Sequence, residues 1–213
     1  HKYVLQGIFW ILVYITLVSA PLLILLLGER LPGREFWREL SVALGFTGLA
    51  MMSLQFVLTA RFKAIKAPYG ADIVYHFHRR ISLVAFTFIL AHPRLLFIFS
   101  PDSLNLLNLF TAPWRARAGV TAVIFLTAMI AFSIWRKKLK IEYTRWRIWH
   151  GVLATLAVIL ATAHVILARY YLNTPWKQVF WISYGVFWVG LLIYIRVLKP
   201  LLLLKRPYEI VNV

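Results

Sequence analysis

The sequence predicts an all-α membrane protein, built as a bundle of six transmembrane helices. Hydrophobic residues make up 62% of the 213 positions and charged residues only 15%, and a soluble domain of this size could not bury so much apolar surface. The apolar residues also fall into six runs, each close to the roughly 20 residues that a helix needs to cross a bilayer. The runs cover residues 4–27, 41–60, 80–100, 118–135, 148–168 and 179–198.

Short polar segments with turn-forming residues separate these runs. The first run is longer than the apolar core of a signal peptide and has no cleavage-like end, so it is interpreted as a true span. Together the six runs predict one membrane domain over residues 1–200. The turn-forming residues are Pro32-Gly33, Pro68-Tyr69-Gly70, Pro113 and Asn173-Thr174-Pro175.

Basic residues predict the orientation of the bundle. The formal net charge of +17 could suggest a nucleic-acid partner, but cytoplasmic loops of membrane proteins carry an excess of Lys and Arg. If both termini are cytoplasmic, sixteen of the 24 basic residues lie inside and eight lie outside. We therefore expect a multi-pass membrane protein with both termini in the cytoplasm and no nucleic-acid partner. The inside residues are Lys2, Arg61, Lys63, Lys66, Arg79, Arg80, Arg136, Lys137, Lys138, Lys140, Arg145, Arg147, Arg196, Lys199, Lys205 and Arg206; the outside residues are Arg30, Arg34, Arg38, Arg94, Arg115, Arg117, Arg169 and Lys177.

The chain contains no cysteine. Its absence excludes disulfides, zinc–thiolate sites, iron–sulfur clusters and thiolate-ligated haem. The predicted spans also hold no Asp or Glu near their histidines, whereas zinc and di-iron sites usually recruit carboxylates. A metal cofactor inside the membrane would therefore depend on histidine.

Four of the six histidines form two pairs with identical spacing. His78 and His92 are 14 residues apart (92 − 78) at the two ends of the third span, and His150 and His164 are 14 apart (164 − 150) at the two ends of the fifth. On a helix of 3.6 residues per turn, 14 steps return to within about 40° of the starting face, roughly 21 Å further along. Each helix therefore presents one imidazole near each membrane surface, on the same side.

This spacing predicts two haem sites. The third and fifth spans run in parallel, so His78 lies level with His150 on the cytoplasmic side, and His92 lies level with His164 on the outer side. Two imidazoles at one height can occupy both axial positions of a haem iron, and neutral imidazole brings no charge into the bilayer. We expect two stacked b-type haems between the third and fifth helices, forming a transmembrane electron conduit. An alternative of another class is a proton-coupled transporter that uses the histidines as a relay.

Several arginines near these histidines are candidates for binding haem propionates or, on the outer side, an anionic acceptor. The guanidinium group matches a carboxylate with two parallel hydrogen bonds. Positive-inside topology and snorkelling to lipid headgroups explain the same residues equally well. The candidates are Arg79, Arg80 and Arg147 on the cytoplasmic side, and Arg94 and Arg169 on the outer side.

Two segments carry a family resemblance. One is His78-Arg79-Arg80-Ile81-Ser82-Leu83 through Leu90-Ala91-His92, and the other is Tyr143-Thr144-Arg145-Trp146-Arg147-Ile148-Trp149-His150. They resemble the ferric reductase-like transmembrane domain shared by NADPH oxidases, ferric reductases and their bacterial relatives. With the six-helix layout, the resemblance extends over nearly the whole chain.

The resemblance implies a membrane oxidoreductase of the NADPH oxidase or ferric reductase type, in a bacterial inner or plasma membrane. In that family a cytoplasmic module that binds FAD and NAD(P)H follows the last helix and supplies electrons through the two haems. The acceptor on the outer face would be oxygen, giving superoxide or hydrogen peroxide, or a ferric chelate. Residues 201–213 look like the linker and first strand toward such a module, but no glycine-rich dinucleotide loop follows in this sequence.

The resemblance also allows a naturally short relative. Such a protein would be the haem-binding membrane subunit of a methionine sulfoxide reductase-type system. Its electrons would come from quinol or from a separate flavoprotein, and the residues leave both possibilities open.

Overall fold

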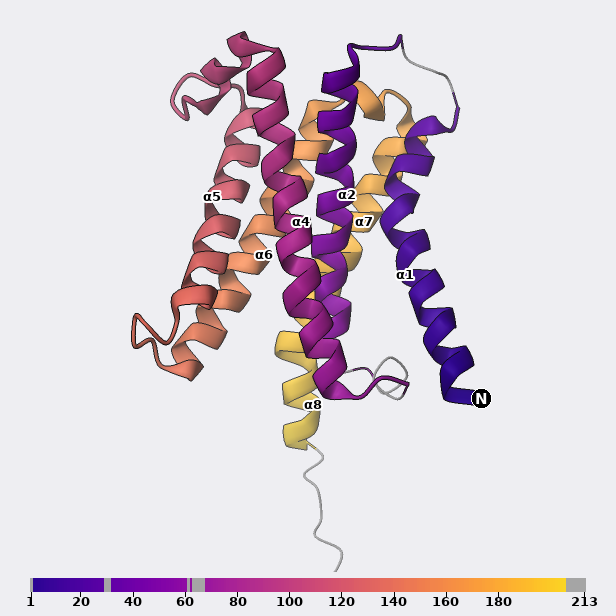
Figure 1. Cartoon of the computed structure of the whole chain (residues 1–213), viewed down its shortest axis with the longest axis vertical. Coiled ribbons are helices and arrows are strands. Elements are labelled where there is room, and N and C mark those ends of the chain that lie inside the picture. Colours follow the sequence, from indigo (N-terminus) through magenta and orange to yellow (C-terminus); the bar gives the residue numbers. More distant parts are fainter. Residues whose placement is uncertain (1, 29–31, 61, 63–67, 206–213) are drawn as a thin grey trace, which may run out of the picture.

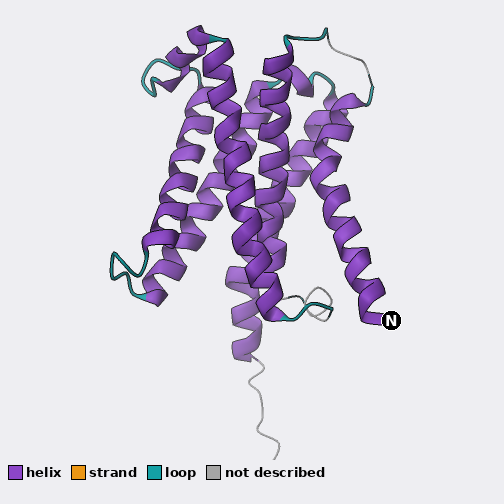
Figure 2. Ribbon diagram, in the orientation of Figure 1, coloured by secondary structure: helices purple, strands orange, loops and turns teal. Residues whose placement is uncertain are grey.

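The computed structural model confirms the six predicted spans. It describes residues 2–28, 32–60, 62 and 68–205, and within these residues every regular element is helical (Figure 2). Among the described residues, six helices are long and apolar enough to cross a membrane. They are α1 (Lys2–Leu26), α2 (Phe36–Thr59), α4 (Ala71–Phe99), α5 (Trp114–Trp135), α6 (Tyr143–Ala168) and α7 (Pro175–Ile193).

The long helices run alternately up and down, as Figure 1 shows. Two short 3-10 helices, η1 (Pro101–Leu107) and η2 (Tyr170–Leu172), lie in the connections, and a π-helical turn, η3 (Tyr194–Leu198), joins α7 to α8 (Lys199–Lys205). Residues 201–205 of the expected linker therefore belong to a helix. The rest of that tail, 206–213, lies outside the described residues, as do five of the basic residues used for orientation: Arg30, Arg61, Lys63, Lys66 and Arg206.

The helices begin earlier than the apolar runs that predicted them. The third run starts at residue 80 but α4 starts at Ala71, and the fifth run starts at residue 148 but α6 starts at Tyr143. The extra turns mix charged and polar residues with apolar ones, and Asp72 in the first turn of α4 suits the positive end of the helix dipole. At α6, the Glu142 carboxylate accepts the backbone N–H groups of Thr144 and Arg145, which caps the helix start.

Two antiparallel helix pairs, α2 with α4 and α5 with α6, form the frame of the bundle (Figure 1). At Gly48 of α2, an added Cβ would lie 2.7 Å from Ile89 Cγ1 and 3.1 Å from the Ala85 carbonyl oxygen of α4. Only glycine permits this approach, as in other membrane helix pairs where small residues bring backbones together. Met129 of α5 and Ala157 of α6 join the buried cluster next to Ala85.

Helices α1 and α7 complete the bundle on one side. Trp181 of α7 is fully buried and packs against Phe46 of α2, with ring centroids 5.0 Å apart. Lys177 of α7 is also buried, and its Nζ lies 3.5 Å from the Leu25 carbonyl oxygen in the last turn of α1. A cation suits that negative end of a helix, so this contact links α7 to α1.

Candidate functional site

The four predicted ligand histidines occupy equivalent places on α4 and α6. His78 and His150 each lie seven residues after the first residue of their helix, about two turns inside it. His92 and His164 follow near the opposite ends of the same helices. We call the end of the bundle where α4 and α6 begin the His78 end, and the opposite end the His92 end.

The structure brings His92 and His164 together. Their ring centroids are 6.3 Å apart, with the ring planes at 64°. The Nδ1–H of His92 donates to the Ser41 carbonyl oxygen of α2 at 2.8 Å, and the Nδ1–H of His164 donates to the Arg115 carbonyl oxygen of α5 at 2.7 Å. A carbonyl oxygen only accepts, so Nδ1 carries the proton in both rings and a neutral imidazole has its lone pair on Nε2.

Two glycines make room for these rings. A Cβ added at Gly45 of α2 would lie 3.1 Å from His92 Cγ, and one added at Gly119 of α5 would lie 2.8 Å from His164 Nδ1. Both distances are shorter than ordinary van der Waals contact, so a larger residue would push the ring away from its carbonyl partner. The close approach of α2 and α5 therefore holds the rings in place.

At the other end, His78 is bonded to a buried glutamine. Its Nδ1 lies 2.9 Å from Gln55 Oε1 of α2. The Gln55 amide nitrogen donates to the Met51 carbonyl oxygen at 2.8 Å, which assigns Oε1 as the acceptor facing the ring. Ser82 Oγ donates to the same oxygen at 3.4 Å. The proton of His78 is therefore also on Nδ1.

Ser133 of α5 faces His150 in the way that Gln55 of α2 faces His78. The His150 Nδ1 lies 3.1 Å from Ser133 Oγ. The single Ser133 hydroxyl proton is donated to the Met129 carbonyl oxygen at 2.7 Å, and Trp146 Nε1–H donates to Ser133 Oγ at 3.2 Å. With its proton used, the serine oxygen can only accept from His150. All four histidines therefore have the same tautomer.

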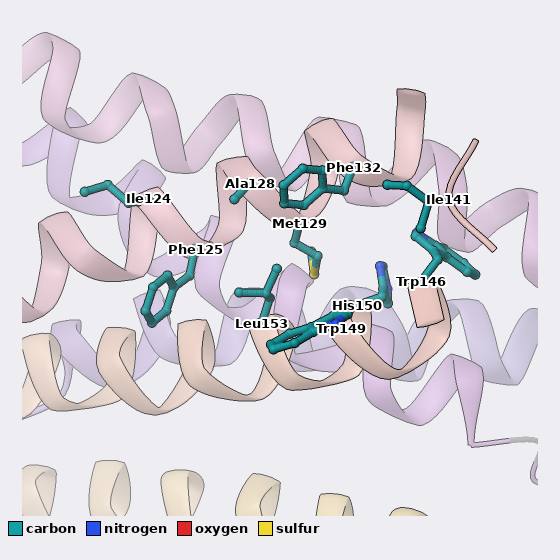
Figure 3. Close-up of a pocket in the computed structure, with 10 residues that line it drawn as sticks. All are labelled: Ile124, Phe125, Ala128, Met129, Phe132, Ile141, Trp146, Trp149, His150 and Leu153. Carbon is teal, nitrogen blue, oxygen red and sulfur yellow. The ribbon is translucent and has the colours of Figure 1, made fainter. Parts of the chain in front are cut away.

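A cavity of about 540 Å³ lies beside His150, between α5 and α6. Figure 3 shows side chains of both helices pointing into the space between them. Its lining is almost entirely apolar, with Phe125 and Phe132 of α5 opposite Trp149 and Leu153 of α6. In Figure 1 the first turns of α6 lie to the left of those of α4, so the helix pairs spread apart at this end. The pairing of His78 with His150 stays a prediction.

The five candidate arginines are all solvent- or lipid-exposed. Three lie at the His78 end and two at the His92 end, where Arg169 terminates α6 with a positive φ of 55°. An exposed arginine can contact a lipid headgroup or a haem propionate, so the roles of these five arginines stay predictions. The three are Arg79, Arg80 and Arg147; the two are Arg94 and Arg169.

Sequence reasoning missed the neighbours that hold the histidines. Ser41 and Gln55 are 14 residues apart on α2 (55 − 41), and Gly119 and Ser133 are 14 apart on α5 (133 − 119). The same spacing separates the histidines that they contact. A search for polar or glycine positions with the histidine spacing on the neighbouring spans would have found them.

Metal ligation by side chains alone has no support in the part of the chain that the structure describes. There, no three or more His, Asp or Glu side chains come together in a group that could hold an ion. The histidines meet as a pair, and a pair supplies two ligands. An iron between two imidazoles would need its other ligands from a macrocycle.

Comparisons with known proteins agree with this architecture. The ferric reductase like transmembrane component family matches residues 44–161, which is more than half of the chain and runs from α2 into α6. The match is shorter than the near-complete resemblance expected from the sequence, and it includes three of the four histidines, ending just before His164.

One relative is an uncharacterized protein of Archaeoglobus fulgidus. It is 26% identical over 124 residues, covering 54% of this chain and 67% of the relative. No solved structure matches. Six membrane-spanning helices together with the family match show that this is an integral, multi-pass membrane oxidoreductase domain at the level of the family. The chain belongs to the ferric reductase-like transmembrane component family.

Proposed function

We propose that this domain carries single electrons across the membrane through two b-type haems. His92 and His164 would hold one iron, and His78 and His150 the other. The observation that carries the proposal is the geometry of the His92 pair. If both rings bound one metal through Nε2 at about 2 Å, with roughly 1 Å more from Nε2 to each ring centre, their centroids would lie about 6 Å apart. The observed separation is 6.3 Å.

The tautomers support the same assignment. Metal-ligating histidines usually donate their other ring N–H to a carbonyl or a polar side chain, which fixes the ring and raises its basicity. Each of the four Nδ1 atoms here faces such an acceptor on the neighbouring helix. Nε2 then provides the lone pair on the iron side.

A haem supplies a reversible one-electron change at its iron. The chain's own residues bind and orient it, while the apolar faces of α4, α5 and α6 exclude water. The excess of basic residues at the His78 end supports a cytoplasmic location for that end. An FAD- and NAD(P)H-binding domain, in this protein or as a separate flavoprotein, would donate electrons there. The acceptor at the His92 end would be oxygen or a ferric chelate.

The visible spectrum of the purified chain tests this proposal. We expect a Soret band and, after reduction, the sharp α and β bands of low-spin haem with two imidazole ligands. A colourless protein that does not bind added haemin would overturn the proposal and favour a proton relay. Assays of superoxide and of ferrous iron, side by side with an electron donor, distinguish the two acceptors.

A further inference from the structure

The four histidines differ in what accepts their Nδ1 protons. At the His92 end the main-chain carbonyl oxygens of Ser41 and Arg115 accept at 2.8 and 2.7 Å, and Ser41 Oγ also lies 3.0 Å from His92 Nδ1. At the His78 end both acceptors are side-chain oxygens, Gln55 Oε1 and Ser133 Oγ. A main-chain acceptor is present whatever the residue, whereas a side-chain acceptor depends on residue type.

We propose that Gln55 and Ser133 are positioning residues that lower the reduction potential of one and the same haem, at the His78 end. The inference rests on the proposed function. It adds that α2 and α5 each contribute one tuning side chain at the His78 end, where no main-chain carbonyl shares the contact with Nδ1 among the hydrogen bonds described.

Gln55 is built for this role. It is 5% exposed, and an amide buried in a membrane helix is costly unless its groups are bonded. Its nitrogen is used by the Met51 carbonyl of its own helix, so the oxygen is held toward His78, one helix away. The second donor to that oxygen, Ser82, comes from one turn further along α4. The glutamine cannot rotate its amide without losing all three bonds.

Ser133 is held just as firmly. Its hydroxyl proton is donated within α5 to Met129, and Trp146 of α6 donates to its oxygen. The remaining lone pair faces His150. The hydroxyl therefore acts as an acceptor with a fixed direction, and it has no proton to offer the ring.

An acceptor on Nδ1–H increases the electron density of the imidazole and so favours the ferric over the ferrous iron that it ligates. Removing the acceptor should therefore raise the midpoint potential. Returning an acceptor oxygen of the same reach should restore it. A purely structural role predicts no such reversal between leucine and glutamate at one position.

The experiment is a potentiometric titration of the haem-loaded, full chain. Gln55→Leu should raise the midpoint potential of one haem component and leave the other unchanged. Gln55→Glu offers a carboxyl oxygen in either protonation state. In this variant, the midpoint potential of the same haem should therefore lie at or below its wild-type value. A tenfold change in the ferric-to-ferrous ratio corresponds to about 59 mV for one electron.

Ser133→Ala provides the second arm, with Thr127→Val as its matched control. Both hydroxyls donate to the carbonyl four residues earlier on α5, at 2.7 Å in each case, but only Ser133 also contacts a histidine. We expect Ser133→Ala to raise the potential of the component that Gln55→Leu moves, while Thr127→Val leaves both potentials unchanged.

The outcomes separate this inference from the function on which it rests. A wild-type chain without haem overturns the proposed function. Two haems in the wild type, with unshifted potentials in Gln55→Leu and Ser133→Ala, overturn only the tuning role. Shifts of different components by the two variants overturn the shared haem. If Gln55→Leu binds too little haem to titrate, retention of both haems by Gln55→Glu supports the role, and loss in both variants overturns it.

Discussion

The two ends of the bundle hold equivalent histidines by different means. At the His92 end, the rings lean on carbonyl oxygens of α2 and α5, and Gly45 and Gly119 let the helices come close enough. At the His78 end, the helix pairs are further apart in Figure 1, and side chains hold the rings within each pair: Gln55 contacts His78 between α2 and α4, and Ser133 contacts His150 between α5 and α6. Ring position thus depends on backbone packing at one end and on residue chemistry at the other.

The largest effect should come from filling the closest glycine contact. In Gly119→Val, the added Cβ lies 2.8 Å from His164 Nδ1, so the ring must leave the Arg115 carbonyl. Overpacking of this kind costs typically about 1–3 kcal/mol, and we expect one of the two haems to be lost, as measured by haem per chain. Gly190→Val is the control, because nothing lies within 4 Å of its added Cβ. Two haems in both variants would contradict the packing account of the His92 end.

A smaller effect is expected at the matching glycine of α2. In Gly45→Ala, the new methyl group lies 3.1 Å from His92 Cγ, so a shift of a few tenths of an ångström relieves the contact. We expect both haems to stay bound, with a changed electron paramagnetic resonance signal for one of them because its ligand planes rotate. An unchanged pair of signals would show that the Gly45 contact does not set the ring angle.

A still smaller effect is expected from Ser41→Ala. Its hydroxyl donates to the His92 carbonyl oxygen at 2.7 Å, and its oxygen lies 3.0 Å from His92 Nδ1. The shorter main-chain bond to His92 Nδ1, at 2.8 Å, remains after the substitution. We expect about 1 kcal/mol lower stability, measured by thermal unfolding in detergent, with haem content and both potentials unchanged. Loss of a haem from Ser41→Ala would remove the contrast between main-chain and side-chain acceptors.

The smallest effect concerns Glu142, outside both histidine levels. The N–H groups of Thr144 and Arg145 hold the pKa of its carboxyl below the usual range. A lowered pKa means that the ionised cap stabilises α6 above the ordinary Glu pKa of about 4.3, and that this contribution disappears as pH falls through the lower, folded-state value. Glu142→Gln should therefore melt below wild type at pH 7, and the difference should shrink toward pH 3. An equal difference at both pH values would show that the charge is not involved.

Much of this architecture could be predicted from the sequence, for a definite reason. Bilayer thickness imposes a run length that composition reveals directly, which is why the six spans were correct. Helical geometry turns the 14-residue spacing into a common face, which is why His92 and His164 were expected to meet. The starts of α4 and α6 could not be predicted from run length, because their first turns mix charged and polar residues with apolar ones and so lie outside the purely apolar runs.

The acceptors of the histidine protons were harder to predict. The carbonyl groups of Ser41 and Arg115 look like every other carbonyl in the sequence, and only the approach of neighbouring helices selects them. Gln55 was visible as a polar residue inside an apolar run, but its partner was not, because His78 lies 23 residues away on another helix. The spacing of histidines in the sequence identifies candidate ligands, whereas the packing of neighbouring helices determines which groups accept their Nδ1 protons.

Haem content in four single variants tests the central claim most directly. We expect two haems per wild-type chain. His92→Ala and His164→Ala should each lose the same haem and keep the other, and His78→Ala and His150→Ala should show the opposite pattern, identified by midpoint potential. A wild-type chain without haem, or losses that group His78 with His92 along one helix, would contradict two haems held between α4 and α6.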